Sequence, residues 1–129
     1  MYRPSSIFTS AGVDPDEVGA ACGLSDPDRL MVKVAPSWLT RRWRTPIAAM
    51  TAPWAIYVRR EVLNGDRRML ARLLTHELVH VRQWADLGML RFSWRYLKGY
   101  LAGRRQGLSH DQAYLQIPLE QEARAISGH

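Results

Sequence analysis

Two histidines and a glutamate lie close together near the middle of the chain, in the run His76-Glu77-Leu78-Val79-His80. On a helix, residues four positions apart lie on the same side, so the imidazoles of His76 and His80 can reach one metal ion. Glu77, one position on, then faces the coordination position that the protein leaves open. This H-E-x-x-H pattern predicts a metal site with a carboxylate placed to act as a base on a water molecule.

The pattern lies in residues 69–88, MLARLLTHELVHVRQWADLG, which we predict to form one long helix. At about 100° per residue, apolar side chains fill one arc of this helix and arginines lie in the opposite arc. His76 and His80 fall at the border of the apolar arc, whereas a solvated surface pair would be expected among the arginines. The alternative is a pair of hydrogen-bonded core histidines, but their spacing around Glu77 favours metal binding.

A catalytic zinc ion usually takes three protein ligands and keeps one position for water, so a third ligand is needed. Asp86 stands at a spacing used by some zinc sites, but it projects away from the two histidines if the helix continues. A later helix offers the carboxylates of Glu120 and Glu122, of which only one can bind well because they point in different directions. His110 is the remaining candidate, as a ligand or as a group near the metal.

Two motifs together resemble a known class of enzymes. Residues 76–84 read HELVHVRQW and residues 118–123 read PLEQEA. They resemble the gluzincin class of zinc metallopeptidases, and especially small bacterial domains with H-E-[LF]-x-H-V-x-Q-W and a downstream P-[FL]-E-x-E-A. The resemblance covers about residues 47–125. In that class the first glutamate of the second motif is a metal ligand, which implies Glu120 in this chain.

The resemblance implies a site and a mechanism. The implied ligands of one Zn²⁺ per chain are His76, His80 and Glu120. Glu77 is then the catalytic base, which takes a proton from the attacking water and passes it to the leaving nitrogen. His110 and Tyr114 are the candidates for a donor to the developing oxyanion. Many relatives have an aspartate four residues after the ligand glutamate, where this chain has Arg124, so support for the ligands must differ here.

Composition and charge limit the class of protein. The chain is 47% hydrophobic, which excludes a disordered protein, and its 129 residues allow one domain with a core. Its net charge is +6. It contains no apolar run of the ~18 residues that a membrane span needs and no apolar secretory signal. Cys22 is the single cysteine, so an intramolecular disulfide is excluded and a cytoplasmic location is expected.

The first 28 residues differ from the rest of the chain. They contain several prolines and glycines and an excess of acidic residues, and we predict a flexible acidic arm over 1–28 and one zincin-like domain over 29–129. Asp14 and Pro15 are consistent with one short helix in the arm. Cys22, which precedes a glycine, raises the hypothesis of a thiolate that blocks the metal, although a buried and inert thiol is favoured.

Strand and helix signals predict an α+β fold. The predicted strands are residues 29–35, 47–51 and 54–59. An edge strand beside a zinc site can pair with an extended peptide. Asp66 is expected to cap the metal-binding helix. The complete prediction is a minimal zincin-like domain, with a strand-rich first half, a small sheet packed on three to four helices, and the metal on the central helix.

Three further helices are predicted after a break at Gly88. The first, residues 89–102, is amphipathic and basic. Its apolar side consists of Leu90, Trp94, Leu97 and Leu101. We expect this side to pack on the core, with contact to a membrane surface as the alternative. The other two helices are residues 109–116, capped by Ser109 or Asp111, and residues 118–126.

The leading functional prediction is a zinc-dependent metallopeptidase that acts on a peptide or protein in a shallow cleft, which a protein partner can complete. The first alternative is a non-catalytic zinc-binding assembly module, against which the intact Glu77 argues. The second is a basic protein that binds nucleic acid or a membrane surface, based on the net charge and the cluster Arg41-Arg42-Trp43-Arg44. A nucleic-acid partner is the less favoured of these two.

Overall fold

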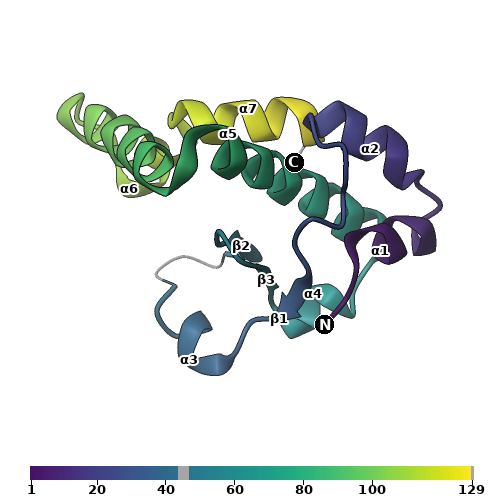
Figure 1. Cartoon of the computed structure of the whole chain (residues 1–129). Coiled ribbons are helices and arrows are strands. Elements are labelled where there is room, and N and C mark those ends of the chain that lie inside the picture. Colours follow the sequence, from purple (N-terminus) through teal and green to yellow (C-terminus); the bar gives the residue numbers. More distant parts are fainter. Residues whose placement is uncertain (44–46, 129) are drawn as a thin grey trace.

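The computed structural model describes residues 1–43 and 47–128 as a mixed α+β fold in which helices predominate (Figure 1). The elements in chain order are α1 (Pro4–Ser10), α2 (Pro15–Cys22), β1 (Val32–Val34), α3 (Ser37–Thr40), β2 (Ala49–Thr51), β3 (Ile56–Val58), α4 (Arg60–Leu63), α5 (Arg67–Arg105), α6 (His110–Leu115) and α7 (Pro118–Ser127). The α+β class is confirmed. The expected strand-rich first half with three or four helices is wrong, because the described residues contain seven helices.

Helix α5 is the element on which the others pack. It begins after Asp66, whose side chain accepts a hydrogen bond from the backbone N–H of Met69 at 3.0 Å, as the predicted cap requires. Its apolar stripe includes Leu70, Leu74 and Leu78, all buried in the core. Figure 1 shows α5 through the middle of the molecule, with the sheet on one side and α7 on the other.

A glycine divides α5 into two segments. Gly88 has φ 74° and ψ 170°, a conformation open to glycine and strained for other residues. The predicted break at this position is therefore confirmed. The first segment, residues 67–87, carries the H-E-x-x-H pattern, and the second segment, residues 89–105, extends away from the sheet toward α6 (Figure 1).

The sheet has three short strands in the order β1-β3-β2. The central strand β3 is parallel to β1 and antiparallel to β2, with Met50 opposite Tyr57. All three predicted strands are present, but each has only three residues. Buried Val32, Ile56 and Val58 join the sheet to the apolar stripe of α5. Because β3 is central, β2 lies at an edge of the described sheet, beside α5.

The expectation of a flexible arm over residues 1–28 is wrong for α1 and α2, which lie within it. α1 and α2 pack on α5, and Ile7, Phe8 and Val18 belong to its hydrophobic core. Several of the prolines and glycines that indicated disorder instead lie at the ends of these helices. Pro4 and Pro15 occupy first-turn positions, where a missing N–H costs nothing, and α2 ends at a left-handed glycine.

The second segment of α5 packs through its glycine side. An added Cβ at Gly103 would lie 3.0 Å from Ala113 of α6, and one at Gly99 would lie 3.0 Å from Pro118 of α7. The predicted helices α6 and α7 are present, and Ser109 caps α6. The expected core packing of the opposite apolar side is wrong, because Leu90, for example, is 85% exposed. Helical periodicity defines an apolar stripe but not the side on which neighbouring helices approach.

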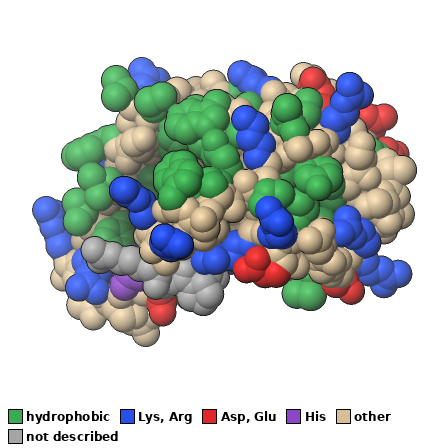
Figure 2. Space-filling view, turned by 90° about the horizontal axis from the view of Figure 1, so that it is seen from below, with side chains coloured by type: hydrophobic (Ala, Val, Ile, Leu, Met, Phe, Trp, Pro, Cys, Tyr) green, Lys and Arg blue, Asp and Glu red, His purple; other side chains and the backbone are tan. Residues whose placement is uncertain are grey.

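Basic side chains outnumber acidic ones, 18 to 12. On the face in Figure 2, hydrophobic side chains form several groups, and lysine and arginine side chains stand between them. Of the basic cluster noted in the sequence, Arg41 and Arg42 are exposed, the Arg59 guanidinium stacks 5.0 Å from the ring centre of Trp43, and Arg44 lies outside the described residues. None of the described helices has both the length and the apolar character that crossing a membrane requires.

Candidate metal centre

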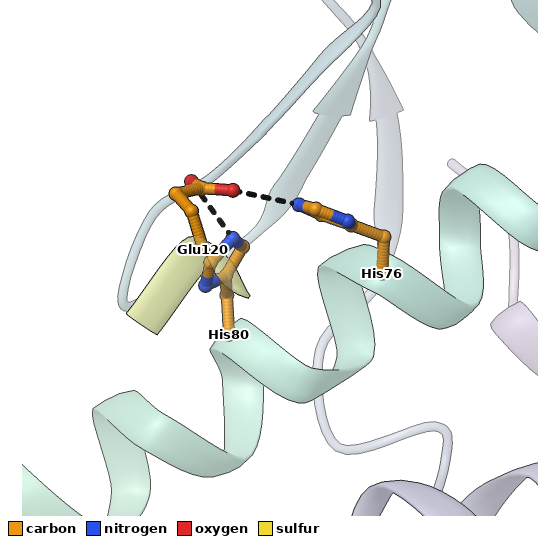
Figure 3. A group of neighbouring side chains, drawn as sticks. All are labelled: His76, His80 and Glu120. Atoms are coloured by element: carbon orange, nitrogen blue, oxygen red, sulfur yellow. Dashed lines mark hydrogen bonds and ion pairs between the residues drawn. The ribbon is translucent and has the colours of Figure 1, made fainter. Parts of the chain in front are cut away.

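Three ligand-type side chains meet between α5 and α7 (Figure 3). His76 Nε2 lies 2.9 Å from Glu120 Oε2, and His80 Nε2 lies 3.1 Å from Glu120 Oε1. The two histidines point the same way because they are four residues apart on α5. Glu120 reaches them from the first turn of α7, which Pro118 begins. All three residues are buried, with 7%, 5% and 3% of their surface exposed.

The group fits a divalent metal ion. Its candidate ligand atoms all lie within 4.8 Å of one another. Two ligand atoms that are each about 2.0 Å from a tetrahedral zinc ion lie about 3.3 Å apart, so the observed nitrogen–oxygen distances need only a small adjustment. Two imidazoles and one carboxylate are the donor set of many catalytic zinc sites, and they also suit other divalent metals.

A chain of polar contacts orients His80. Its Nδ1 lies 2.8 Å from Gln83 Oε1, so Nδ1 carries the proton toward Gln83 and Nε2 is directed at Glu120. The Gln83 amide in turn donates to the Leu119 carbonyl at 3.0 Å and to Glu122 at 2.9 Å. The hydrogen bond from Gln83 and the positive charge of Arg82 lower the pKa of Glu122. Glu122 therefore supports a ligand instead of being one.

The charges of the group are coupled. Burial disfavours the charged form of His80, but its hydrogen bond to Glu120 and the carboxylates of Glu77 and Glu120 outweigh burial and raise the pKa of His80 to about 9. Burial also disfavours the charged form of Glu120, yet the hydrogen bonds from His76 and His80 hold the pKa of Glu120 far below its usual range. Both shifts favour a negative charge on Glu120 and a positive charge on His80.

A tyrosine also holds Glu120. The Tyr96 hydroxyl, from the second segment of α5, donates to Glu120 Oε1 at 2.9 Å. Burial and the charge of Glu120 raise the pKa of Tyr96, so its phenol remains protonated and keeps donating. This contact exists because Gly88 redirects the helix, and Phe92, one turn earlier, contacts the ring of His80 at 6.1 Å between centroids.

Glu77 is tied to the edge strand of the sheet. The Thr51 hydroxyl, on β2, donates to Glu77 Oε2 at 2.5 Å. The indole N–H of Trp84 donates to the Thr51 carbonyl at 3.2 Å, which fixes β2 against α5. Glu77 is 4% exposed, and it lines the same hollow as Thr51, His80 and Glu120.

Two adjoining hollows meet at Glu77. The first has a volume of about 260 Å³ and is lined by His80 and Glu120 together with the rings of Phe92, Tyr96 and Tyr114. The second has a volume of about 460 Å³. Its lining includes Leu73, His76, Asp111, Leu115 and Arg124. Ala49, Glu77 and Tyr114 line both hollows, so the two form a cleft that extends on both sides of Glu77 along β2.

The other ligand candidates from the sequence lie elsewhere. Asp86 is exposed and pairs with Arg82 at 3.7 Å on the surface of α5. His110 is exposed and bonds the Tyr100 hydroxyl at 2.9 Å. Cys22 is buried with its sulfur 3.5 Å from the Thr75 carbonyl, and it is not part of the ligand group. The hypothesis of a thiolate on the metal thus has no support in the described geometry.

Three residues that support the ligand group and Glu77 were not predicted from the sequence: Thr51, Gln83 and Tyr96. Gln83 carried a signal, since it lies one helical turn after His80 on the same side. Trp84 belongs to the same motif, and its hydrogen bond to β2 gives that position a physical role. Thr51 and Tyr96 carried no such signal, because their contacts depend on how β2 and the second segment of α5 fold back onto the first segment.

No protein-family model, curated protein sequence or solved structure gives a significant match to this chain.

Proposed function

We propose that this protein is a zinc-dependent metallopeptidase with a minimal zincin-like fold, acting on peptide or protein substrates. The observation that carries this proposal is the position of Glu77. Its buried carboxylate lines the cleft beside the metal-ligand group and is held by Thr51. A zinc site that only stabilises the fold does not require a carboxylate beside an open coordination position.

In this proposal His76, His80 and Glu120 hold one zinc ion. When bound, zinc polarises the substrate carbonyl and lowers the pKa of water, which makes peptide hydrolysis possible near neutral pH. Gln83 keeps His80 in the tautomer that directs Nε2 at the metal, and Tyr96 keeps Glu120 in place. Similar chains have an aspartate at the position of Arg124, and that aspartate can support the ligands. In this chain Gln83 and Tyr96 provide the support instead.

Glu77 performs the proton transfers. Its carboxylate takes a proton from the attacking water and later delivers it to the nitrogen of the leaving amine. Thr51 restricts the carboxylate to one orientation, which reduces the reorganisation that each transfer requires.

Tyr114 is the best-placed donor to the oxyanion that develops on the substrate carbonyl. It lines both hollows of the cleft, and burial together with the charge of Glu120 raises its pKa, so the phenol stays protonated. The other candidate from the sequence, His110, is bonded to Tyr100 and does not line the cleft. Of these two hollows, Tyr96 lines only the smaller, and both tyrosines also interact with Glu120.

The edge strand β2 supports an extended substrate. Arg59 N–H donates to the Ala48 carbonyl and Ala52 N–H to the Ala55 carbonyl, which are pairs with β3. Since hydrogen-bonding directions alternate along an antiparallel strand, Ala49 and Thr51 direct their backbone groups away from β3. Thr51 bonds Trp84, whereas Ala49 lines both hollows. A peptide paired with Ala49 would place its carbonyl beside Glu77.

The aromatic lining of the smaller hollow indicates which substrate side chain is expected next to the cleaved bond. Phe92, Tyr96 and Tyr114 surround this space, and its volume of about 260 Å³ suits one large apolar side chain. We therefore propose cleavage next to an aromatic or large aliphatic residue. The buried single cysteine is consistent with a reducing, cytoplasmic compartment as the place of action.

The test compares Glu77→Gln with the wild type for both zinc content and cleavage of a peptide library. We expect about one zinc per chain in both proteins, and a loss of at least about 100-fold in cleavage rate in the variant, because general-base catalysis contributes that much. Glu17→Gln, at an exposed glutamate of α2, is the matched control and should cleave normally.

Two outcomes would contradict the proposal. Absence of bound metal after zinc is supplied would exclude a zinc enzyme. Bound zinc without cleavage in the wild type, with the fold stabilised equally by zinc in Glu77→Gln, would instead identify a non-catalytic zinc module.

A further inference from the structure

The second segment of α5 presents an apolar ridge to solvent. Leu90, Trp94, Leu97 and Leu101 follow one another at helical spacing and are 85%, 63%, 48% and 42% exposed. At about 100° per residue these four side chains fall within an arc of about 60°. They form a continuous stripe along three turns of the helix, which we call the apolar ridge. Single exposed apolar residues are ordinary on protein surfaces, but a stripe of four is not.

The opposite side of the same segment makes the contacts with the fold. Phe92 is buried against His80 and Trp84, and Gly99 and Gly103 allow close approach of α7 and α6. The apolar ridge therefore contributes little to packing within this chain. Its residues remain available for a partner.

The charges within the segment that carries the apolar ridge are of one sign. Residues 87–110 contain five lysines and arginines and no aspartate or glutamate. The five are Arg91, Arg95, Lys98, Arg104 and Arg105, and all of them are exposed. On the helix, Arg91, Lys98 and Arg105 border the ridge on one side, and Arg104 borders it on the other. A helix with tryptophan and leucine on one face and cations beside it is the pattern of helices that lie in a membrane interface.

We propose that the apolar ridge inserts into the surface of a membrane rich in anionic lipid, with the flanking cations at the level of the lipid phosphates. The helix lies parallel to the membrane plane. The leucines and the Trp94 ring enter the boundary between headgroups and acyl chains, and Arg91, Arg95 and Lys98 extend to the headgroups. Charge complementarity selects anionic lipid, because each cation gains from a negative surface and residues 87–110 contain no acidic side chain that opposes it.

Other occupants fit the surface less well. A second copy of the chain would bring five cations of one helix against five of the other, with no acidic residue of this segment to pair with them. A nucleic acid would meet the cations and Trp94, but it offers nothing apolar for Leu90, which is the most exposed residue of the ridge.

The experiment measures sedimentation of the full chain with two kinds of vesicle. One contains equal parts of phosphatidylcholine and phosphatidylglycerol, and the other contains phosphatidylcholine alone. We expect the protein to bind the mixed vesicles, to bind the neutral vesicles far more weakly, and to be released by high salt. The tryptophan emission should shift to the blue on binding, and Trp94→Phe should still bind while losing most of this shift.

Two sets of variants separate the apolar and charged contributions. Leu90→Gln with Trp94→Gln should weaken binding by roughly 100-fold, because each side chain loses its burial in lipid. Arg91→Gln, Arg95→Gln and Lys98→Gln together should weaken binding by roughly 100-fold, at about fivefold for each cation. Met69→Gln is the matched control, since Met69 is 65% exposed on the first segment of α5 and should bind like the wild type. All of these positions are exposed, so circular dichroism should show an unchanged fold.

Three results would overturn the inference. The first is no binding of the folded wild type to the mixed vesicles. The second is binding that survives Leu90→Gln with Trp94→Gln and is matched by salt-dependent binding to duplex DNA, which would assign the surface to nucleic acid. The third is a dimer in solution that the same double variant disrupts, which would assign the ridge to a second copy of this chain.

Discussion

Zinc affinity should depend steeply on pH, because His80 must lose a proton before its nitrogen can bind a metal. In the metal-free protein the Nε2 of His80 lies 3.1 Å from the carboxylate of Glu120, and the carboxylates of Glu120 and Glu77 help to raise the pKa of His80 to about 9. At neutral pH this imidazole is charged, whereas a metal ligand must be neutral. Zinc therefore competes with one proton at this site.

The size of the effect follows from the pKa. At pH 7, two units below the pKa, only about 1% of His80 is neutral, which weakens zinc binding by about 100-fold, or about 2.7 kcal/mol. The apparent affinity should rise about tenfold for each pH unit from pH 7 to pH 9 and then level off. About one proton should leave His80 for each zinc bound at pH 7.

Competition with a chromophoric chelator at pH 7, 8 and 9 measures this affinity, and calorimetry in two buffers with different heats of ionisation counts the released protons. His110→Ala is the control, because His110 is exposed and bonds Tyr100 outside the ligand group. The variant should show the same slope as the wild type. An affinity that stays constant from pH 7 to pH 9, or no proton release at pH 7, would refute the assigned role of His80.

The stability of the metal-free protein should have the opposite pH dependence. The folded-state pKa of His80 is raised above the ordinary value of 6.5, so its ion pair with Glu120 contributes fully below about pH 6.5 and is lost as the pH rises through about 9. The loss is on the order of 3 kcal/mol for a shift of this size. Chemical denaturation in the presence of a chelator should therefore show lower stability at pH 9.5 than at pH 6.5, and excess zinc should reverse the trend.

Three further predictions concern residues around the centre. Tyr96→Phe removes the donor to Glu120 and should lower zinc affinity by about 10- to 100-fold, whereas Tyr100→Phe, whose hydroxyl meets His110, should not; chelator competition measures both, and equal affinities would exclude a role of Tyr96 in supporting the ligand. Gly88→Ala should lower the free energy of unfolding by about 1–3 kcal/mol in denaturant titrations, because φ 74° with ψ 170° is strained for alanine; unchanged stability would show that the helix tolerates another path. The Cys22 thiol is buried, which raises its pKa to about 11, so iodoacetamide at pH 8 should modify the denatured but not the native protein, and rapid native labelling would contradict this packing.

Helix signals that depend on neighbouring residues were predictable from the sequence. The spacing of His76 and His80 on one side of a helix, the cap at Asp66 and the break at Gly88 all follow from the 3.6-residue period and from backbone preferences. The positions of the three strands were also predicted, although each is shorter than expected. These features are local, so the residues within one or two turns contain the information.

Predictions were wrong where they rested on the average composition or the apolar pattern of a segment. Prolines and glycines in residues 1–28 indicated a loose arm, but Pro4, Pro15 and Gly23 lie at the ends of α1 and α2, and apolar residues of these helices reach the core. The apolar ridge shows the reverse case, since a stripe that predicts burial is exposed. In both cases burial depends on which side of the helix another element covers. The sequence of a single helix does not determine that side.

The sequence by itself determined the long helix with its cap at Asp66, the two helices that follow it, and the direction in which His76 and His80 point. Only the tertiary structure brings Glu120, and not Glu122, Asp86 or His110, to these histidines. The reason is that a third ligand from another helix depends on how α7 packs on α5, and the path of the 39 residues between His80 and Glu120 is set by many weak contacts. The placement of Thr51 and Tyr96 has the same origin, because each reaches the centre only after a strand and a redirected helix have folded back beside it.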